Sequence, residues 1–128
     1  MVVDTSVIVA ILFREAERRT FYDKILDDGS ASISAVSYME AGMVLTSRLG
    51  AAAEPALDQT LQDLGIVIVP VTVAQAKLAL QAFGQYGKGR HPAGLNCGDC
   101  FSYALAKSSA EPLLFKGGDF ARTDISVA

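Results

Sequence analysis

Four acidic side chains in this sequence could together bind a metal ion, although they lie far apart along the chain. They are Asp4, Glu40, Asp99 and Asp119, and each lies just after a predicted strand or in the early turns of a predicted helix. In an open parallel sheet the ligand crevice lies beyond the carboxyl ends of the strands, so the fold would bring all four to one edge. Carboxylates without a histidine cluster favour hard divalent cations such as Mg²⁺ and Mn²⁺. Such ions typically serve phosphoryl chemistry.

Each acid also has a purely structural explanation. Asp4 could cap the first helix, and Asp119 follows two glycines as an ordinary turn residue does. Glu40 lies three residues after Ser37, which is the spacing of a capping box, and Asp99 lies three residues after Asn96, where the helix dipole favours a carboxylate. The first acid, however, lies in the most apolar segment of the chain, where a charge is costly unless it is paired or bound to a metal. Capping and metal binding are also compatible, because a cap fixes where a carboxylate points.

A C-x-x-C pair of cysteines flanks Asp99, and these thiols could carry the chemistry in place of the carboxylate. Cys97 and Cys100, with Phe101, Ala104 and Leu105, follow the spacing of the core-facing stripe of a helix. Both thiols are therefore expected to be small buried apolar groups. No second C-x-x-C exists to complete a zinc site, so the carboxylate between the cysteines is the better candidate, with the preceding asparagine as its supporting cap.

The order of predicted elements indicates one three-layer α/β/α domain with a mostly parallel central sheet, because strands separated by helices imply right-handed crossovers. The predicted helix at residues 35–50 has its apolar positions, Met39, Met43, Val44 and Leu49, nearly all on one side. The predicted strands are residues 1–3, 31–33, 66–70 and 111–116, with a last edge strand at 125–128. The predicted helices are residues 7–13, 14–29, 35–50, 51–65, 72–86 and 97–109.

Composition is consistent with a single globular domain spanning residues 1–128. Hydrophobic residues make up 51% of the chain and charged residues 20%, which excludes a disordered protein. The net charge of −3 argues against binding nucleic acid by bulk positive charge, but not against a nuclease whose carboxylates hold cations. The apolar start lacks a basic leading region and carries an early aspartate, so a soluble cytoplasmic protein without a membrane anchor is expected.

Four segments together resemble the PIN-domain ribonucleases, and more narrowly the VapC-type toxins of bacterial toxin–antitoxin pairs. They are "VVDTSVIVAIL", "SAVSYMEAGMVL", "GKGRHPAGLNCGDCFSYALA" and "LLFKGGDFARTDI", and they cover essentially the whole chain in order. The resemblance implies a Mg²⁺- or Mn²⁺-dependent endoribonuclease with a PIN-like fold. The family's four acids map onto Asp4, Glu40, Asp99 and Asp119. The hydroxyl that follows the first acid maps onto Ser6, with Thr5 beside it, and such hydroxyls support the metal site or the phosphate.

Further expectations concern RNA and protein partners. The basic loop ahead of the third acid offers Lys88, Arg90 and His91 for RNA contact, and Lys116 lies close to the fourth acid in the chain. The resemblance also implies a VapB-type antitoxin whose tail fills a groove beside the site, and a homodimer or a heterotetramer with that antitoxin. The apolar helices around residues 18–26 and 37–49 would be the groove walls.

Three positions depart from the family's pattern without removing an acid. Gly118 stands where an asparagine often precedes the fourth acid, Cys97 where an aromatic residue is frequent, and Gly94 where a basic residue is common. Other functions remain open at this point. They are a phosphotransfer or phosphohydrolase domain with Asp4 as nucleophile, a thiol redox protein, and a non-catalytic RNA- or protein-binding module of the same fold.

Overall fold

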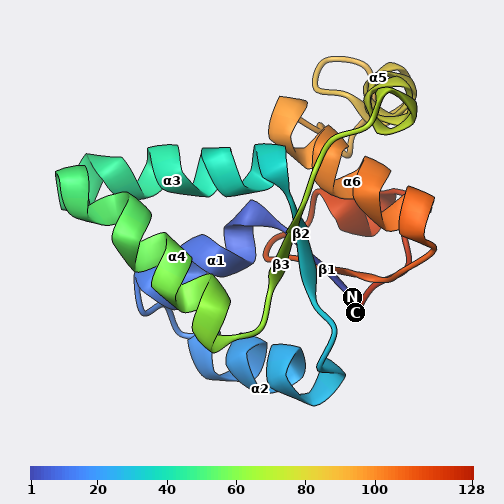
Figure 1. The fold of residues 1–128 in the computed structure, drawn as a ribbon. Coiled ribbons are helices and arrows are strands. Elements are labelled where there is room, and N and C mark those ends of the chain that lie inside the picture. The colour runs from blue at the N-terminus through green and yellow to red at the C-terminus, as the bar shows by residue number, and fades with distance from the viewer.

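Four short parallel strands form the centre of the fold, in the order β3-β2-β1-β4 (Figure 1). The computed structural model describes all 128 residues. Val2 is aligned with Ser32 on one side and with Leu113 on the other, so β1 is central. The strands are β1 (Val2–Val3), β2 (Ser32–Ser34), β3 (Val67–Val69) and β4 (Leu113–Leu114). The prediction of a parallel sheet is confirmed.

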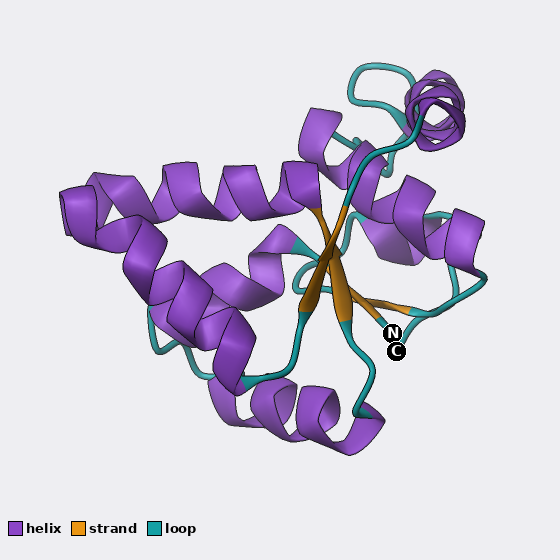
Figure 2. Ribbon diagram, in the orientation of Figure 1, coloured by secondary structure: helices purple, strands orange, loops and turns teal.

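Six α-helices cover the sheet on both faces, which gives the expected three-layer architecture (Figure 2). Two short 3₁₀ helices, Gly50–Ala52 and Phe120–Arg122, complete the elements. The α-helices are α1 (Thr5–Leu12), α2 (Arg18–Asp28), α3 (Ala35–Leu49), α4 (Ala53–Asp63), α5 (Val73–Tyr86) and α6 (Cys97–Ser109). No helix is long and apolar enough to cross a bilayer.

Two hydrophobic cores lie on opposite faces of the sheet, because successive strand residues point to opposite sides. Val3 and Leu114 pack with α1 to α4 in one core. Their neighbours Val2 and Leu113 pack with α5 and α6 in the other. Strands of only two residues can anchor both cores because every residue of β1 and β4 is buried. The rigid centre positions whatever follows the carboxyl ends of these strands.

Two expectations about the elements are corrected. The segment 125–128 is not a full strand: it forms a single parallel bridge, Leu113 with Val127, at the edge of β4. Of the apolar residues expected to pack together on α3, Met39, Met43, Val44 and Leu49 are all exposed to solvent, and Met43 is 65% exposed. The side of α3 that packs inward carries Ser37, Ala41 and Leu45. Helix α3 thus buries its smaller side chains and leaves an unpartnered apolar face.

Candidate active site

Asp4 lies at the carboxyl end of β1 and caps α1, as its position in the chain predicts. It is only 4% exposed. Its Oδ2 accepts a hydrogen bond from the Ser6 amide at 2.9 Å, and its Oδ1 accepts one from the Ser102 hydroxyl at 2.5 Å. These two bonds fix the carboxylate in a site that excludes most water.

Glu40 lies in the second turn of α3, and its predicted capping box with Ser37 is wrong. Helix α3 follows β2 directly, and its cap is Ser34, whose hydroxyl accepts from the Val36 amide at 3.3 Å. The Ser37 side chain is instead fully buried. Burial, and then the nearby charge of Asp4, raise the pKa of Glu40.

The Glu40 carboxylate occupies the space beside the backbone of Gly98, in the first turn of α6. A Cβ at position 98 would overlap Oε2 and the carboxyl carbon of Glu40. Figure 1 shows the first turns of α3 and α6 side by side, which is what this contact requires. Glu40 therefore approaches Asp99, the next residue, only because position 98 carries no side chain.

Asp99 forms the predicted cap with Asn96 as a reciprocal capping box. The Asp99 amide donates to Asn96 Oδ1 at 2.9 Å, and the Asn96 amide donates to Asp99 Oδ2 at 3.0 Å. Burial raises the pKa of Asp99 to about 6, the hydrogen bond from Asn96 opposes this shift, and the charges of the other three acids add to it. The negative charges of Asp4, Glu40 and Asp119 thus all contribute to the raised pKa of Asp99.

Asp119 is exposed and begins the 3₁₀ helix that follows β4, where its side chain makes no capping bond. The loop that carries it is tied to α1, because the Lys116 amide donates to the Ser6 hydroxyl at 2.9 Å. Ser6 therefore supports two acids: its amide donates to Asp4, and its hydroxyl holds the loop that carries Asp119. The fold brings all four acids to the carboxyl edge of the sheet, as their positions in the chain predict.

The donor set fits an oxygen-coordinated divalent cation in its chemistry. All four groups are carboxylates, and mutual repulsion contributes to the raised pKa of both Glu40 and Asp99, which a cation would relieve. As the side chains stand, no three acidic, histidine or cysteine residues lie close enough together to surround one ion. Closing around an ion therefore requires side-chain rotation, which is open to the uncapped Asp119 carboxylate.

The basic candidates have different environments. Lys88 and Arg90 are exposed in the loop before α6, with the Arg90 guanidinium 5.8 Å from the centre of the Phe83 ring. His91 has a structural bond, because its Nδ1 accepts from the Ala93 amide at 3.0 Å.

The side chain of Lys116 is already engaged by two acids. Its ammonium forms ion pairs with Glu15 and, at 3.1 Å, with Glu17. Hydrogen bonds to these two carboxylates raise the pKa of Lys116. An RNA phosphate would have to compete with both.

The two cysteines differ, which corrects the expectation that both are buried. Cys100 is buried, and burial raises the pKa of its thiol to about 11. Cys97 is exposed because it is the first residue of α6, beyond the end of the packed stripe. Both line an apolar cavity of about 280 Å³ between α5 and α6.

Sequence reasoning missed Ser102, the buried partner of Asp4. The available signal was its place inside the apolar run "CFSYALA", where a hydroxyl needs a partner.

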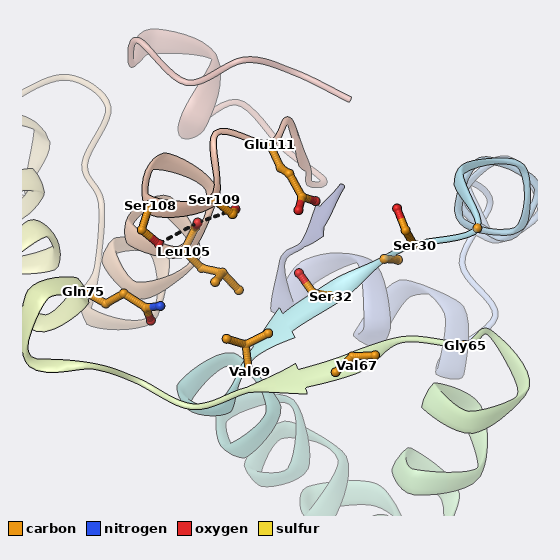
Figure 3. A pocket seen from close by; sticks show the side chains of 12 residues that line it. Ser30, Ser32, Gly65, Val67, Val69, Gln75, Leu105, Ser108, Ser109 and Glu111 are labelled. Atoms are coloured by element: carbon orange, nitrogen blue, oxygen red, sulfur yellow. Dashed lines mark hydrogen bonds between the residues drawn. The ribbon is translucent and has the colours of Figure 1, made fainter.

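The largest cavity, about 570 Å³, contains none of the four acids (Figure 3). It lies against β2 and β3, and the hydroxyls of Ser108 and Ser109 in its wall are bonded to the Leu105 carbonyl. Its polar side chains on α6 therefore satisfy the local helix and are not directed at a ligand.

Comparison with known proteins identifies the family. The PIN domain model matches residues 1–126. The chain is 47% identical over 126 residues to "Ribonuclease VapC" of Mycolicibacterium smegmatis, covering 98% of both chains, and 45% identical over 129 residues to "Ribonuclease VapC28" of Mycobacterium tuberculosis, covering 100% of this chain and 97% of the relative.

Solved structures agree with this assignment at the level of the fold. The crystal structure of M. tuberculosis VapC20, described as a Sarcin-Ricin loop cleaving toxin, superposes with a TM-score of 0.77 at 17% identity, covering 99% of this chain and 97% of the other. A toxin–antitoxin complex from Klebsiella pneumoniae gives a TM-score of 0.72 at 19% identity, covering 99% and 95%. The chain belongs to the PIN-domain family and, within it, to the VapC group.

Proposed function

We propose that this protein is a metal-dependent endoribonuclease, the toxin of a toxin–antitoxin module, which hydrolyses phosphodiester bonds in RNA. The observation that carries the proposal is the gathering of four carboxylates at the carboxyl edge of the sheet, where Asp99 senses the charges of the other three. The relatives at 45–47% identity are named ribonucleases. The buried Asp4, with both oxygens hydrogen-bonded, is poorly suited to act as a nucleophile.

Mg²⁺ or Mn²⁺ is the proposed cofactor, because both prefer oxygen ligands. Asp4, Glu40 and Asp99 would hold it, directly or through water, and Asp119 would complete the site. When bound, such an ion neutralises phosphate charge and lowers the pKa of a coordinated water. With such an ion bound, Asp99 and Glu40 would be ionised, because the cation relieves the repulsion that contributes to their raised pKa values. A carboxylate oxygen that does not contact the ion would then be able to accept a proton from water.

RNA is proposed to approach along the loop before α6. Lys88 and Arg90 are exposed there and free of carboxylate partners, so they are the preferred phosphate contacts. His91 and Lys116 remain candidates with weaker support, since each already has protein partners. Changing Lys88 and Arg90 to Ala should raise KM for RNA more than it lowers kcat.

The decisive test uses Glu40→Gln, because the Glu40 carboxylate is held by packing and its replacement breaks no cap. We expect metal-dependent RNA cleavage to fall at least about 100-fold, as for loss of a metal ligand or its support, while the circular dichroism spectrum stays unchanged. Asp4→Asn should act likewise. Asp27→Asn, an exposed acid on α2, is the matched control and should cleave at the wild-type rate. Full activity of Glu40→Gln would refute the assignment.

A VapB-type antitoxin is the proposed protein partner. One structural neighbour is itself a toxin–antitoxin complex. In this chain, the exposed Met39 and Met43 line a cavity of about 330 Å³ between α3 and α4, with Leu57 at its floor. A second cavity, about 420 Å³, lies along α2 beside Tyr22 and Leu26. Flexible methionine side chains suit a surface that accepts an amphipathic segment.

The antitoxin proposal is tested with the protein encoded immediately upstream, if it is short. Met43→Asp should weaken neutralisation by that protein and leave RNA cleavage intact, because Met43 lies on the solvent side of α3. Cleavage lost together with neutralisation would instead place this face in catalysis. A homodimer, or a heterotetramer with the antitoxin, and a cytoplasmic location beside cellular RNA complete the proposal.

A further inference from the structure

Three buried hydroxyl groups lie directly beneath the acids. The buried polar and charged residues of the chain number six, and Asp4, Thr5, Ser37 and Ser102 are four of them. Ser37 and Ser102 have no exposed surface at all. Buried hydroxyls are costly unless they are paired, so a cluster of them in one place indicates a common purpose.

The Ser37 and Ser102 hydroxyls form a connected chain that ends on Asp4, and the Thr5 hydroxyl bonds the backbone of Ser37. Ser102 Oγ lies 2.5 Å from Asp4 Oδ1, Ser37 Oγ lies 2.9 Å from Ser102 Oγ, and Thr5 Oγ1 donates to the Ser37 carbonyl at 3.1 Å. An ionised carboxylate only accepts hydrogen bonds, and a serine has one hydroxyl proton. Ser102 therefore donates to Asp4, and Ser37 donates to Ser102. The direction of every bond in the chain is fixed.

Each hydroxyl belongs to an element that carries one of the acids. Thr5 directly follows Asp4, Ser37 precedes Glu40 by one helical turn on α3, and Ser102 follows Asp99 by one turn on α6. Residues three apart on a helix lie on the same face. The bonds between the hydroxyls therefore connect β1–α1, α3 and α6 at the level just below the carboxylates.

We infer that Thr5, Ser37 and Ser102 form a buried brace that sets the mutual positions of Asp4, Glu40 and Asp99, and that Ser102 is the positioning residue for Asp4. The inference rests on the proposed function, since it assigns the brace to the proposed metal site. With Oδ1 held by Ser102 and Oδ2 by the Ser6 amide, both oxygens of Asp4 are restrained, which limits the carboxylate to one orientation. Loss of Ser102 leaves one of these two restraints.

The test compares Ser102→Ala with Ser109→Ala, which removes a hydroxyl of the same helix that is bonded only to α6 carbonyls. Mn²⁺ affinity is measured from the rise in melting temperature over a Mn²⁺ titration, alongside kcat and KM for RNA. We expect Ser102→Ala to weaken Mn²⁺ binding about 10- to 100-fold, as loss of an outer partner of a metal ligand does, and to lower kcat with little change in KM. Ser109→Ala should match the wild type in all three.

Ser37→Ala provides a second variant if Ser102→Ala fails to fold, because it keeps the donor to Asp4 and removes only the bond that orients it. It should change Mn²⁺ affinity and kcat in the same direction by a smaller factor. A lowered melting temperature with unchanged Mn²⁺ affinity and kcat in both variants would show that the hydroxyls stabilise the fold only, and would overturn the inference.

A metal-free measurement separates this inference from the proposed function. In the absence of metal, the Ser6 amide should exchange its hydrogen faster in Ser102→Ala than in the wild type, because its acceptor is then less restrained. Unchanged exchange contradicts the brace whatever the activity. Faster exchange in a protein whose wild type neither binds Mn²⁺ nor cleaves RNA supports the brace and refutes the proposed function instead.

Discussion

Gly98 is the residue whose lack of a side chain shapes the site, because the Glu40 carboxylate fills the space of its missing Cβ. We predict that Gly98→Ala displaces Glu40 and lowers metal-dependent cleavage at least about tenfold. Stability should be unchanged or higher by roughly 0.5–1 kcal/mol, since alanine is favoured over glycine inside a helix. Cleavage assays and urea denaturation of the same preparation measure the two effects.

The matched control for this substitution is Gly84→Ala on α5, where a Cβ would meet nothing within 4 Å. It should gain the same helical stability and keep full activity. If Gly98→Ala also kept full activity, the position of Glu40 would not matter to the reaction, and its role as a metal ligand would be untenable.

Asp99 should make the metal-free protein less stable at neutral than at mildly acidic pH. Its pKa is raised to about 6 in the folded state from 3.8, so between these values the folded state binds more protons than the unfolded state. The free energy of unfolding then falls as pH rises through this window, and the penalty is complete above the folded pKa. After allowance for solvent screening at this partly exposed carboxyl, we expect about 1–2 kcal/mol.

Urea denaturation with a chelator present, at about pH 5 and about pH 7.5, measures roughly half of this difference, because pH 5 already lies inside the window. Asp99→Asn keeps an oxygen to accept from the Asn96 amide and cannot ionise, so its stability should change less between the two pH values. If the free energy of unfolding changed between the two pH values by the same amount in the wild type and in Asp99→Asn, ionisation of Asp99 would not be the cause.

At the scale of single residues, the sequence predicted the four acids and neutral partners such as Ser6 and Asn96, but it missed Ser102. The acids could be found because a carboxylate directly after an apolar strand is unusual. Their proximity could be predicted because the carboxyl ends of parallel strands lie at the same edge of a sheet. The apolar run around Ser102 indicated a hydroxyl in need of a partner, but the sequence could not show which one, because Asp4 lies 98 residues away. The exposure of Cys97 was mispredicted for a related reason: helical periodicity does not show where the neighbouring packing ends.

At the scale of elements, the first turn of α6 controls where Asp99 points. Removing the cap with Asn96→Ala should cost about 1 kcal/mol of stability. It keeps the backbone amide that donates to Asp99 Oδ2 but removes the side-chain oxygen that accepts from the Asp99 amide. The first turn of α6 then holds the Asp99 carboxylate less firmly, so metal-dependent cleavage should fall as well. Thermal unfolding and cleavage rates test both consequences.

Thr72→Ala is the matched variant, because Thr72 caps α5 with a bond to the Gln75 amide and that helix carries none of the four acids. It should lose similar stability without losing activity. Equal loss of activity in both variants would attribute the effect of Asn96 to general destabilisation.

The element order was predictable from apolar runs and helix-entry residues, and the exact starts were not. Helix α3 begins immediately after β2, so Ser34 ends the strand and caps the helix at once. The S-x-x-E spacing indicated Ser37 as the cap, but the Ser37 hydroxyl is bonded to Ser102 on α6, and Ser34 caps the helix instead. The last segment forms one bridge because β4 is only two residues long and offers little edge to pair with.

At the scale of the whole molecule, two apolar surfaces remain uncovered on different elements. One is the solvent side of α3, with Met39 and Met43. The other lies on α5, where Leu80 is 72% exposed beside the cavity shared with α6. Figure 1 shows α5 and the far end of α3 on opposite sides of the sheet. One surface can therefore be occupied without blocking the other, as a heterotetramer of toxin and antitoxin requires.

We assign the α5 surface to the proposed homodimer, because exposed contiguous apolar side chains usually mark an interface. Leu80→Glu should convert a dimer to a monomer in sedimentation experiments, since pairing two copies would bury two like charges. Leu26→Glu on α2 is the control: it is also an exposed leucine, 53% exposed, but it lies in the proposed antitoxin groove and should leave the dimer intact. A dimer that survives Leu80→Glu and dissociates with Leu26→Glu would place the dimer contact on the α2–α3 side of the molecule instead. In that case the antitoxin would compete with dimerisation, because both would need the α2–α3 side of the molecule.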